Sequence, residues 1–136
     1  MTTNAQYKDL VAAAKKAMEG AYAPYSKFHV GAALLSIDDE IIPGCNIENA
    51  SYGLSNCAER TAIFKAVSEG KTRFKALAVI GKTDLPIAPC GACRQVIREF
   101  CDPDMPIILA NENGDMELTN IATLLPYSFG PEDLNK

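Results

Sequence analysis

Four residues in two short segments carry the side chains best suited to chemistry: Cys57 and Glu59 in the first, Cys90 and Cys93 in the second. Cys90 and Cys93 are one helical turn apart, so both sulfurs can face one point, and Cys57 can join them from another helix. Helix N-termini favour the thiolate form of cysteine because their potential is positive. Three thiolates satisfy Zn²⁺ and leave one tetrahedral position open for water, which is typical of catalytic zinc sites.

Glu59 decides between a structural and a catalytic zinc site. A carboxylate two residues after a ligand can lie over the open position, take a proton from the bound water and pass it on. Taken alone, Glu59 could be a solvated acid in the first turn of a helix, where the dipole stabilises it. Its place beside three candidate ligands favours the proton shuttle.

Other uses of the five cysteines remain open at this stage. The C-x-x-C pair could be redox-active, but this leaves Cys57 and Glu59 unexplained. A structural zinc site could recruit Cys45 or Cys101 as a fourth ligand, although both are interpreted as small buried hydrophobes. An odd number of cysteines without an export signal argues against a disulfide framework.

The elements that position these residues follow from hydrophobic periodicity and turn residues. Helices are expected over 7–18, from Cys57 to Gly70, and over 90–100, with a short one ending at Leu125. Strands are expected over 28–37, 40–48, 75–80, 107–110 and 116–118, with a bulge at Pro43-Gly44. Strands separated by helices indicate a mixed sheet covered on both faces, a three-layer α/β/α sandwich.

Composition limits the partners. The 136 residues are 48% hydrophobic and 22% charged, as in a globular protein, and are expected to form a single domain over 1–136. A formal charge of −4 without a basic stripe argues against nucleic acid and favours a small polar molecule. No stretch has the length of a membrane helix and the N-terminus lacks a signal-peptide pattern, so we expect a cytoplasmic protein.

The order Cys57-x-Glu59 and Pro89-Cys90-x-x-Cys93 resembles the signature of zinc-dependent nucleoside and nucleobase deaminases, in the variant with cysteine in place of the first histidine ligand. More narrowly, the chain resembles the short homotetrameric cytidine deaminases of the cytidine/deoxycytidylate deaminase superfamily. The segments that fit them run in order almost end to end: 22–28, 44–52, 56–62, 89–95, 124–126 and Phe129. The resemblance implies a cytidine deaminase-like fold with a five-stranded sheet.

The resemblance also implies an activity, which is hydrolytic deamination of free cytidine and deoxycytidine to uridine and deoxyuridine plus ammonia, in pyrimidine salvage. Zinc, one per chain, would activate a hydroxide that attacks ring carbon 4, with Glu59 as proton shuttle. Arg60, with Gln95 as a helper, would donate hydrogen bonds to the cysteine sulfurs and offset their negative charge. The implied substrate contacts within one chain are Phe28, Asn46, Glu48 and the backbone of Ala58.

The resemblance further implies a homotetramer whose active sites are shared between subunits. Neighbouring subunits would contribute Ala50, Tyr52 and Phe129 to each site. Three rivals remain: a related deaminase for blasticidin or guanine, a polynucleotide-editing deaminase, and a structural zinc module that mediates protein contacts. The acidic charge and the set Phe28, Asn46 and Glu48 favour the free nucleoside.

Overall fold

The computed structural model describes residues 4–134, which are built around a mixed five-stranded sheet of order β2-β1-β3-β4-β5. The strands are β1 (Val30–Ser36), β2 (Ile41–Cys45), β3 (Phe74–Gly81), β4 (Ile107–Asn111) and β5 (Met116–Thr119). Strands β3 and β4 pair in parallel and every other neighbouring pair is antiparallel. The parallel pair is joined through a helix, as such a crossover requires.

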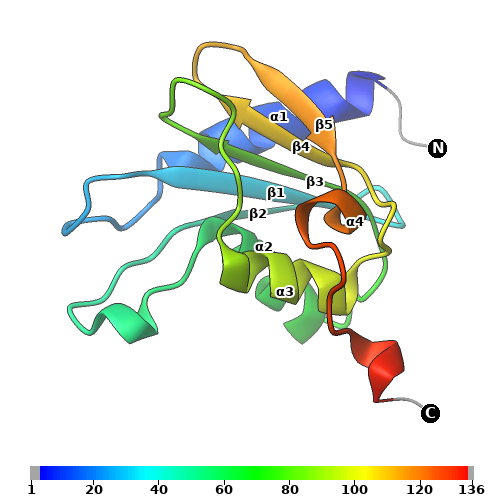
Figure 1. The fold of residues 1–136 in the computed structure, drawn as a ribbon. Helices are drawn as coiled ribbons and strands as arrows, with labels where there is room; N and C mark the ends of the chain where they lie inside the picture. The colour runs from blue at the N-terminus through cyan, green and yellow to red at the C-terminus, as the bar shows by residue number, and fades with distance from the viewer. Residues whose placement is uncertain (1–3, 135–136) are drawn as a thin grey trace.

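Helices cover both faces of this sheet, which confirms the predicted three-layer α/β/α architecture (Figure 1). Helix α1 (Asn4–Met18) lies on one face, and α2 (Ala58–Ser68) and α3 (Gly91–Phe100) lie on the other. A short helix α4 (Ile121–Leu124) and two 3₁₀ turns, Tyr52–Leu54 and Pro131–Asp133, complete the elements. Within residues 4–134 no helix combines the length and apolar character needed to cross a membrane.

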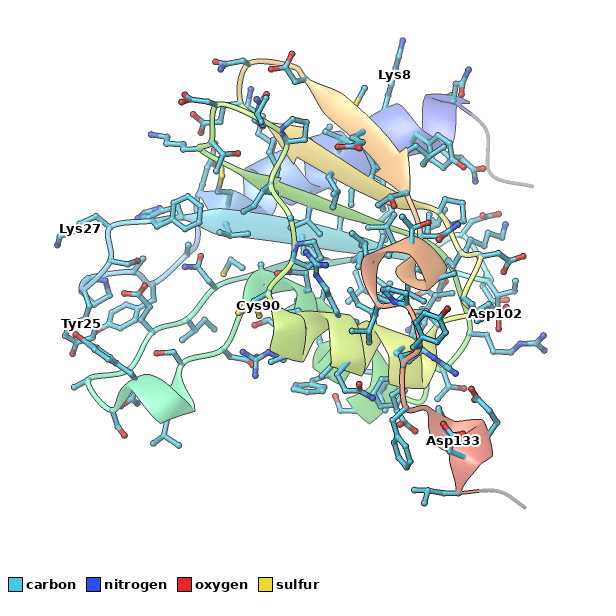
Figure 2. All side chains as sticks on the ribbon, viewed as in Figure 1. Lys8, Tyr25, Lys27, Cys90, Asp102 and Asp133 are labelled. Atoms are coloured by element: carbon cyan, nitrogen blue, oxygen red, sulfur yellow. The ribbon has the colours of Figure 1, made fainter. Side chains whose placement is uncertain are left out.

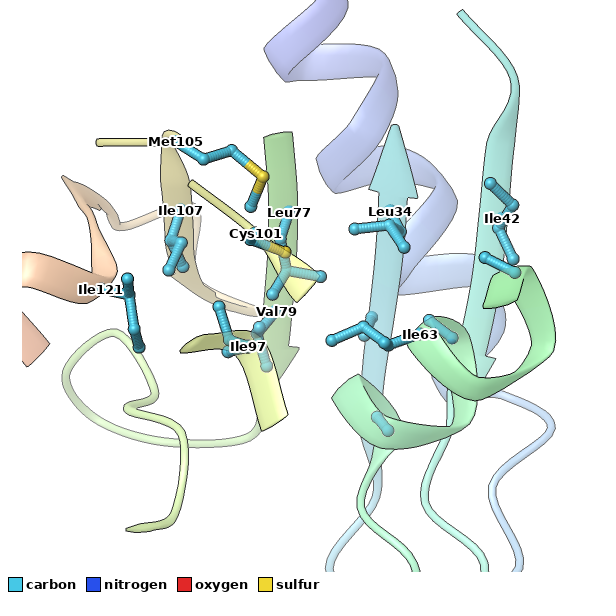
Figure 3. Close-up of a cluster of buried hydrophobic side chains, with 14 of the residues drawn as sticks. Leu34, Ile42, Ile63, Leu77, Val79, Ile97, Cys101, Met105, Ile107 and Ile121 are labelled. Atoms are coloured by element: carbon cyan, nitrogen blue, oxygen red, sulfur yellow. The ribbon is translucent and has the colours of Figure 1, made fainter. Parts of the chain in front are cut away.

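The two faces of the sheet are buried by side chains of different size. On the side of α2 and α3, large residues such as Leu34, Val79 and Ile97 interlock in the core (Figure 3). On the side of α1 the strands present mainly small residues, among them Ala33 and Ala78. Small side chains let a helix approach the sheet closely, and a Cβ atom at Gly31 would clash with the Ala14 carbonyl oxygen of α1.

The observed boundaries differ from the predicted ones in a regular way. Helices α2 and α3 each begin one residue after a cysteine, because Cys57 and Cys90 adopt the extended backbone of N-cap residues. The hairpin strands β1 and β2 are shorter at both ends than the predicted strands over 28–37 and 40–48. The predicted bulge at Pro43-Gly44 is wrong, since both residues pair in regular register with β1, and the irregularity lies between Leu35 and Ser36 instead.

Gly44 has a packing role that explains its place in the edge strand β2. A Cβ atom at this position would lie 2.6 Å from the backbone nitrogen of Ala62 and 2.7 Å from the carbonyl oxygen of Ala58, both in α2. Backbone atoms of a helix cannot move aside as a flexible side chain can. The absence of a side chain at Gly44 therefore sets how closely α2 approaches the sheet.

Replacing this glycine should destabilise the fold. We expect Gly44→Ala to lower the free energy of unfolding by about 1–3 kcal/mol, the usual cost of overpacking, as measured by urea denaturation at fixed zinc concentration. Gly53→Ala is the matched control, because a Cβ at Gly53 has no atom within 4 Å. Equal stability of the two variants would show that α2 can shift without cost.

Candidate zinc centre and substrate cavity

Helices α2 and α3 begin at the same end of the sheet, where strands β3 and β4 have their carboxyl ends. Helix α2 leads by a short turn into β3, and α3 returns from the far end of β3 toward the start of β4. Both helix N-termini consequently lie at the carboxyl end of the parallel pair, and the two helices contact each other. This end is where open α/β sheets usually bind ligands.

Three thiols meet at these helix N-termini. The sulfurs of Cys57, Cys90 and Cys93 all lie within 4.8 Å of one another, and Cys57 Sγ is 3.7 Å from Cys90 Sγ. Figure 2 marks Cys90 at the start of α3, facing the start of α2. Tetrahedral zinc with Zn–S bonds of about 2.3 Å requires sulfurs about 3.8 Å apart. The donor set and its spacing therefore fit one zinc ion.

The two remaining cysteines do not belong to this group. Among the described residues, the metal-binding group found contains three thiols and neither Cys45 nor Cys101. Cys101 is buried in the core on the α2 and α3 side, where burial raises the pKa of its thiol to about 12. A site with four cysteine ligands is thus not formed, and one coordination position is left for another ligand.

Arg60 lies against the sulfurs from the first turn of α2. Its Nη2 donates a hydrogen bond to Cys57 Sγ at 3.3 Å, and its Nε is buried with no partner among the described residues. Hydrogen bonding from Cys93 and then from Arg60 lowers the pKa of Cys57 to about 5. The pKa of Cys93 is raised, first by its hydrogen bond to Cys57 and then by burial. Arg60 therefore favours negative charge on the cluster, which zinc binding requires.

Removal of this guanidinium should weaken zinc binding. We expect Arg60→Ala to raise the zinc dissociation constant by about 10- to 100-fold, the usual effect of losing a partner of a metal ligand, in a chelator competition assay. Arg98→Ala is the control, because Arg98 lies on α3 and contacts Ser128 and Glu132 in the C-terminal segment. Equal zinc affinity of Arg60→Ala and the unmodified chain would contradict this role.

Glu59 is the buried carboxyl of the site. Its residue is 4% exposed, and burial raises its pKa to about 7, with a further rise from the nearby Cys57 thiolate. A carboxyl with a pKa near neutrality can both accept and release a proton at physiological pH. Its position two residues after Cys57, the N-cap residue of α2, keeps it beside the thiol cluster and at the wall of a cavity.

This cavity has a volume of about 310 Å³, at the small end of the range of about 300–1,000 Å³ for ligand pockets. Apolar residues form much of its wall: Phe28, Val30, Ala58, Ile87 and Ala88. Its polar lining comprises Cys57, Glu59 and Cys90 at the thiol cluster and Ser26, Asn46 and Glu48 from the strand-edge loops. Ser26 and Glu48 also line a second hollow of about 420 Å³, formed with Tyr25, Tyr52 and Ser55. The two hollows therefore meet at Ser26 and Glu48, and each combines apolar walls with a few polar side chains.

The structure brings together most of the predicted site residues. Phe28, Asn46, Glu48 and Ala58 line the same cavity as Glu59. Tyr52 is 76% exposed at the rim of the second hollow, and Ala50 is exposed in the same loop.

Two predicted residues lie elsewhere. Phe129 is 60% exposed and does not line the cavity of its own chain. Gln95 Nε2 donates a hydrogen bond to the Phe129 carbonyl oxygen at 2.9 Å, so its predicted help to the sulfurs stays a prediction. The C-terminal segment is therefore attached to α3 by a hydrogen bond, and Phe129 is not part of the lining of this cavity.

Sequence reasoning assigned no role to Arg94, which holds the loop in front of α3. Its Nε donates to the Pro89 carbonyl oxygen at 2.8 Å and its Nη1 donates to the Leu124 carbonyl oxygen at 2.7 Å. The first bond fixes the peptide directly before Cys90. Only the position of Arg94 in the first turns of α3, four residues after Cys90, could have signalled this role.

A buried carboxyl with a pKa near neutrality, next to a three-thiol cluster that fits zinc, is suited to splitting a bond with water. The fold and this arrangement define a zinc-dependent hydrolase. Residues 4–109 match the family model described as the cytidine and deoxycytidylate deaminase zinc-binding region. The chain belongs to this family, and its three-thiol cluster fits one zinc ion per chain.

Individual relatives agree with this assignment. The chain is 61% identical over 126 residues to a cytidine deaminase of Sporosarcina psychrophila, covering 93% of each chain. It is 55% identical to a cytidine deaminase of Halalkalibacterium halodurans, covering 93% of this chain and 96% of the relative. The crystal structure of cytidine deaminase from Burkholderia pseudomallei superposes with a TM-score of 0.89 at 54% identity, covering 90% of this chain and 98% of that one.

Proposed function

We propose that the chain deaminates free cytidine and deoxycytidine by hydrolysis, giving uridine or deoxyuridine and ammonia, as a step of pyrimidine salvage. The observation that carries this proposal is the placement of Glu59, a buried carboxyl between a three-thiol cluster and an apolar cavity. Two relatives of similar length, 61% and 55% identical to the chain, are named cytidine deaminases, which supports the same substrate.

Cys57, Cys90 and Cys93 are the proposed zinc ligands. When bound, zinc would lower the pKa of a coordinated water molecule. Glu59 takes a proton from the attacking water and delivers it to ring nitrogen 3 as carbon 4 becomes tetrahedral. Glu59 then passes the second proton of that water to the departing amino group. One water is consumed, the carbon–nitrogen bond breaks and ammonia leaves.

The cavity suits a nucleoside because it combines apolar walls with polar side chains at Asn46 and Glu48. A planar pyrimidine matches the apolar walls formed by Phe28, Val30 and Ile87, with the Ala58 backbone at its edge. The hydroxyls of the sugar match Asn46 and Glu48, which lie two residues apart on one side of the chain. Glu48 also faces the second hollow, so a sugar bound there stays close to solvent.

The charge of the site favours a nucleoside over a nucleotide. Two carboxyls, Glu48 and Glu59, line the cavities, whereas the described lining residues include no Lys or Arg. A phosphate on the sugar would face these carboxyls without a counterion, and such like-charge contacts cost several kcal/mol. We expect kcat/KM for cytidine to exceed that for cytidine monophosphate by at least about 100-fold, as followed by ultraviolet absorbance. Equal values would contradict the charge argument.

The same assay separates the proposal from its rivals. Turnover of cytidine and deoxycytidine, but not of blasticidin S, guanine or single-stranded DNA, supports the proposed substrate. If the chain turned over one of the competing compounds and not cytidine or deoxycytidine, that compound would become the proposed substrate. A zinc-loaded chain that deaminates none of these compounds would point to a structural module.

We further propose that the active form is a homotetramer to which Ala50, Tyr52 and Phe129 contribute across subunit boundaries. The exposure of Tyr52 and Phe129, and the attachment of Phe129 to α3 away from its own cavity, support this assignment. Light scattering after size-exclusion chromatography should give four times the mass of one chain. Full activity in a monomer would overturn it.

A further inference from the structure

The segment Tyr25–Phe28 encloses the carboxylate of Glu48. The backbone nitrogens of Tyr25 and Ser26 donate to Glu48 Oε1 at 3.0 and 3.1 Å. The hydroxyl of Ser26 donates to the other oxygen, Oε2. These bonds, the Ser26 hydroxyl first, lower the pKa of Glu48. A single short segment thus holds both oxygens of the proposed sugar acceptor.

Ser26 is also the point on which this segment folds back. Its Oγ accepts a hydrogen bond from the backbone nitrogen of Phe28 at 3.0 Å while its proton goes to Glu48. Lys27, between them, has a positive φ of 61° that turns the chain around the hydroxyl. The Lys27 side chain projects away from the fold and takes no part in the enclosure (Figure 2). A residue that both donates and accepts is required here, and serine does both.

Asn46 fixes the other end of the segment. Its Oδ1 accepts from the Val30 nitrogen at 2.8 Å, and its Nδ2 donates to the Phe28 carbonyl oxygen at 2.8 Å. Phe28 is therefore held through its carbonyl by Asn46 and through its nitrogen by Ser26. Phe28 would keep its place through the Asn46 bond if the Ser26 hydroxyl were removed, whereas Glu48 would lose its only side-chain donor described here.

We propose that Ser26 is a positioning residue for sugar recognition, which orients Glu48 so that its remaining lone pair accepts a hydrogen bond from a sugar hydroxyl. This inference rests on the proposed function and adds a residue to it. Three donors occupy three of the about four lone-pair sites of the carboxylate. Because Glu48 lines the cavity, the remaining acceptor site is available to a ligand there. Ser26 itself lines this cavity, at the place where it joins the second hollow.

The test compares substrates and inhibitors that contain the sugar with analogues that contain only the base. In Ser26→Ala we expect KM for cytidine and deoxycytidine to rise about tenfold, the effect of losing one hydrogen bond to a charged group, with kcat nearly unchanged. For 1-methylcytosine, which has the base but no sugar, kcat/KM should equal that of the unmodified chain. Inhibition constants for uridine and 1-methyluracil should show the same contrast without requiring turnover of a sugar-free substrate.

Two variants control the test. Ser26→Thr keeps the hydroxyl and should restore KM, whereas Ser68→Ala removes a hydroxyl that only caps a carbonyl of α2 and should change nothing. An unchanged KM in Ser26→Ala, or an equal loss with the sugar-free compounds, would overturn the proposal. Failure of the unmodified chain to deaminate any nucleoside would instead refute the proposed function.

Discussion

Glu59→Gln is expected to keep its zinc and to lose activity by about 10²- to 10⁴-fold or more, the range that positioned acid–base groups contribute. Glutamine has the shape of glutamate but cannot carry a proton from water to the substrate. Because Glu59 is buried, its charged form is costly, and the neutral variant should be at least as stable as the parent. The measurements are steady-state deamination of cytidine, zinc content per chain and thermal unfolding.

Glu69→Gln is the matched control for this variant. Glu69 follows the other end of the same helix α2 and is exposed, so the same change of charge should leave kcat unaffected. Full activity in Glu59→Gln would refute the proton shuttle. Loss of zinc in Glu59→Gln would instead mean that the carboxyl helps to hold the metal.

The four candidate reactive residues of the site could be predicted because each pair is close together in the sequence. Cys90 and Cys93 are one helical turn apart, and Cys57 and Glu59 share the first turn of another helix. Helix periodicity alone therefore places Cys90 and Cys93 on one side. Glu59 is kept near Cys57 because it follows this N-cap residue by two positions at the start of α2. The parallel pairing of β3 with β4 brings the two helix N-termini together. The sequence indicated this arrangement, because the apolar run over 75–80 is typical of a buried parallel strand.

The contacts that support the site could not be predicted in the same way. Ser26 and Glu48 are separated by 22 residues, and Arg94 and Leu124 by 30. Hydrogen bonds across such distances depend on the path of loops, which leaves no periodic trace in the sequence. Sequence patterns therefore identified the reactive groups but assigned no role to Ser26 or Arg94.

Gly44 illustrates a different limit. A Pro-Gly pair inside a strand often marks a bulge, and this general tendency produced the wrong prediction. In this fold Pro43 is tolerated because β2 is an edge strand, and Gly44 is required by the backbone of α2. A Pro-Gly pair can mark a β-bulge or allow a helix to pack closely on the strand. Which of the two occurs depends on the neighbouring helix, which the pair itself does not reveal.

Cys90→Ala should lose zinc and activity together. Two thiolates would remain, and structural and catalytic zinc sites need at least three protein ligands. Occupancy is expected to fall from one zinc per chain to close to zero after dialysis, and deamination to fall to background. Cys45→Ala is the control, because Cys45 lies outside the metal-binding group and its loss should leave zinc in place. Full occupancy in Cys90→Ala would refute the ligand assignment.

The fold should survive this loss of metal, which separates the zinc site from those of small zinc-dependent domains. Two hydrophobic clusters, one on each face of the sheet, bury the strands without any contribution from the metal. Cys90 itself is exposed at the start of α3, so its truncation leaves no cavity in either cluster. We therefore expect Cys90→Ala to unfold cooperatively with the secondary structure of the parent, as measured by circular dichroism. An unfolded variant would mean that the metal holds α2 and α3 on the sheet, and the site would then be structural as well as catalytic.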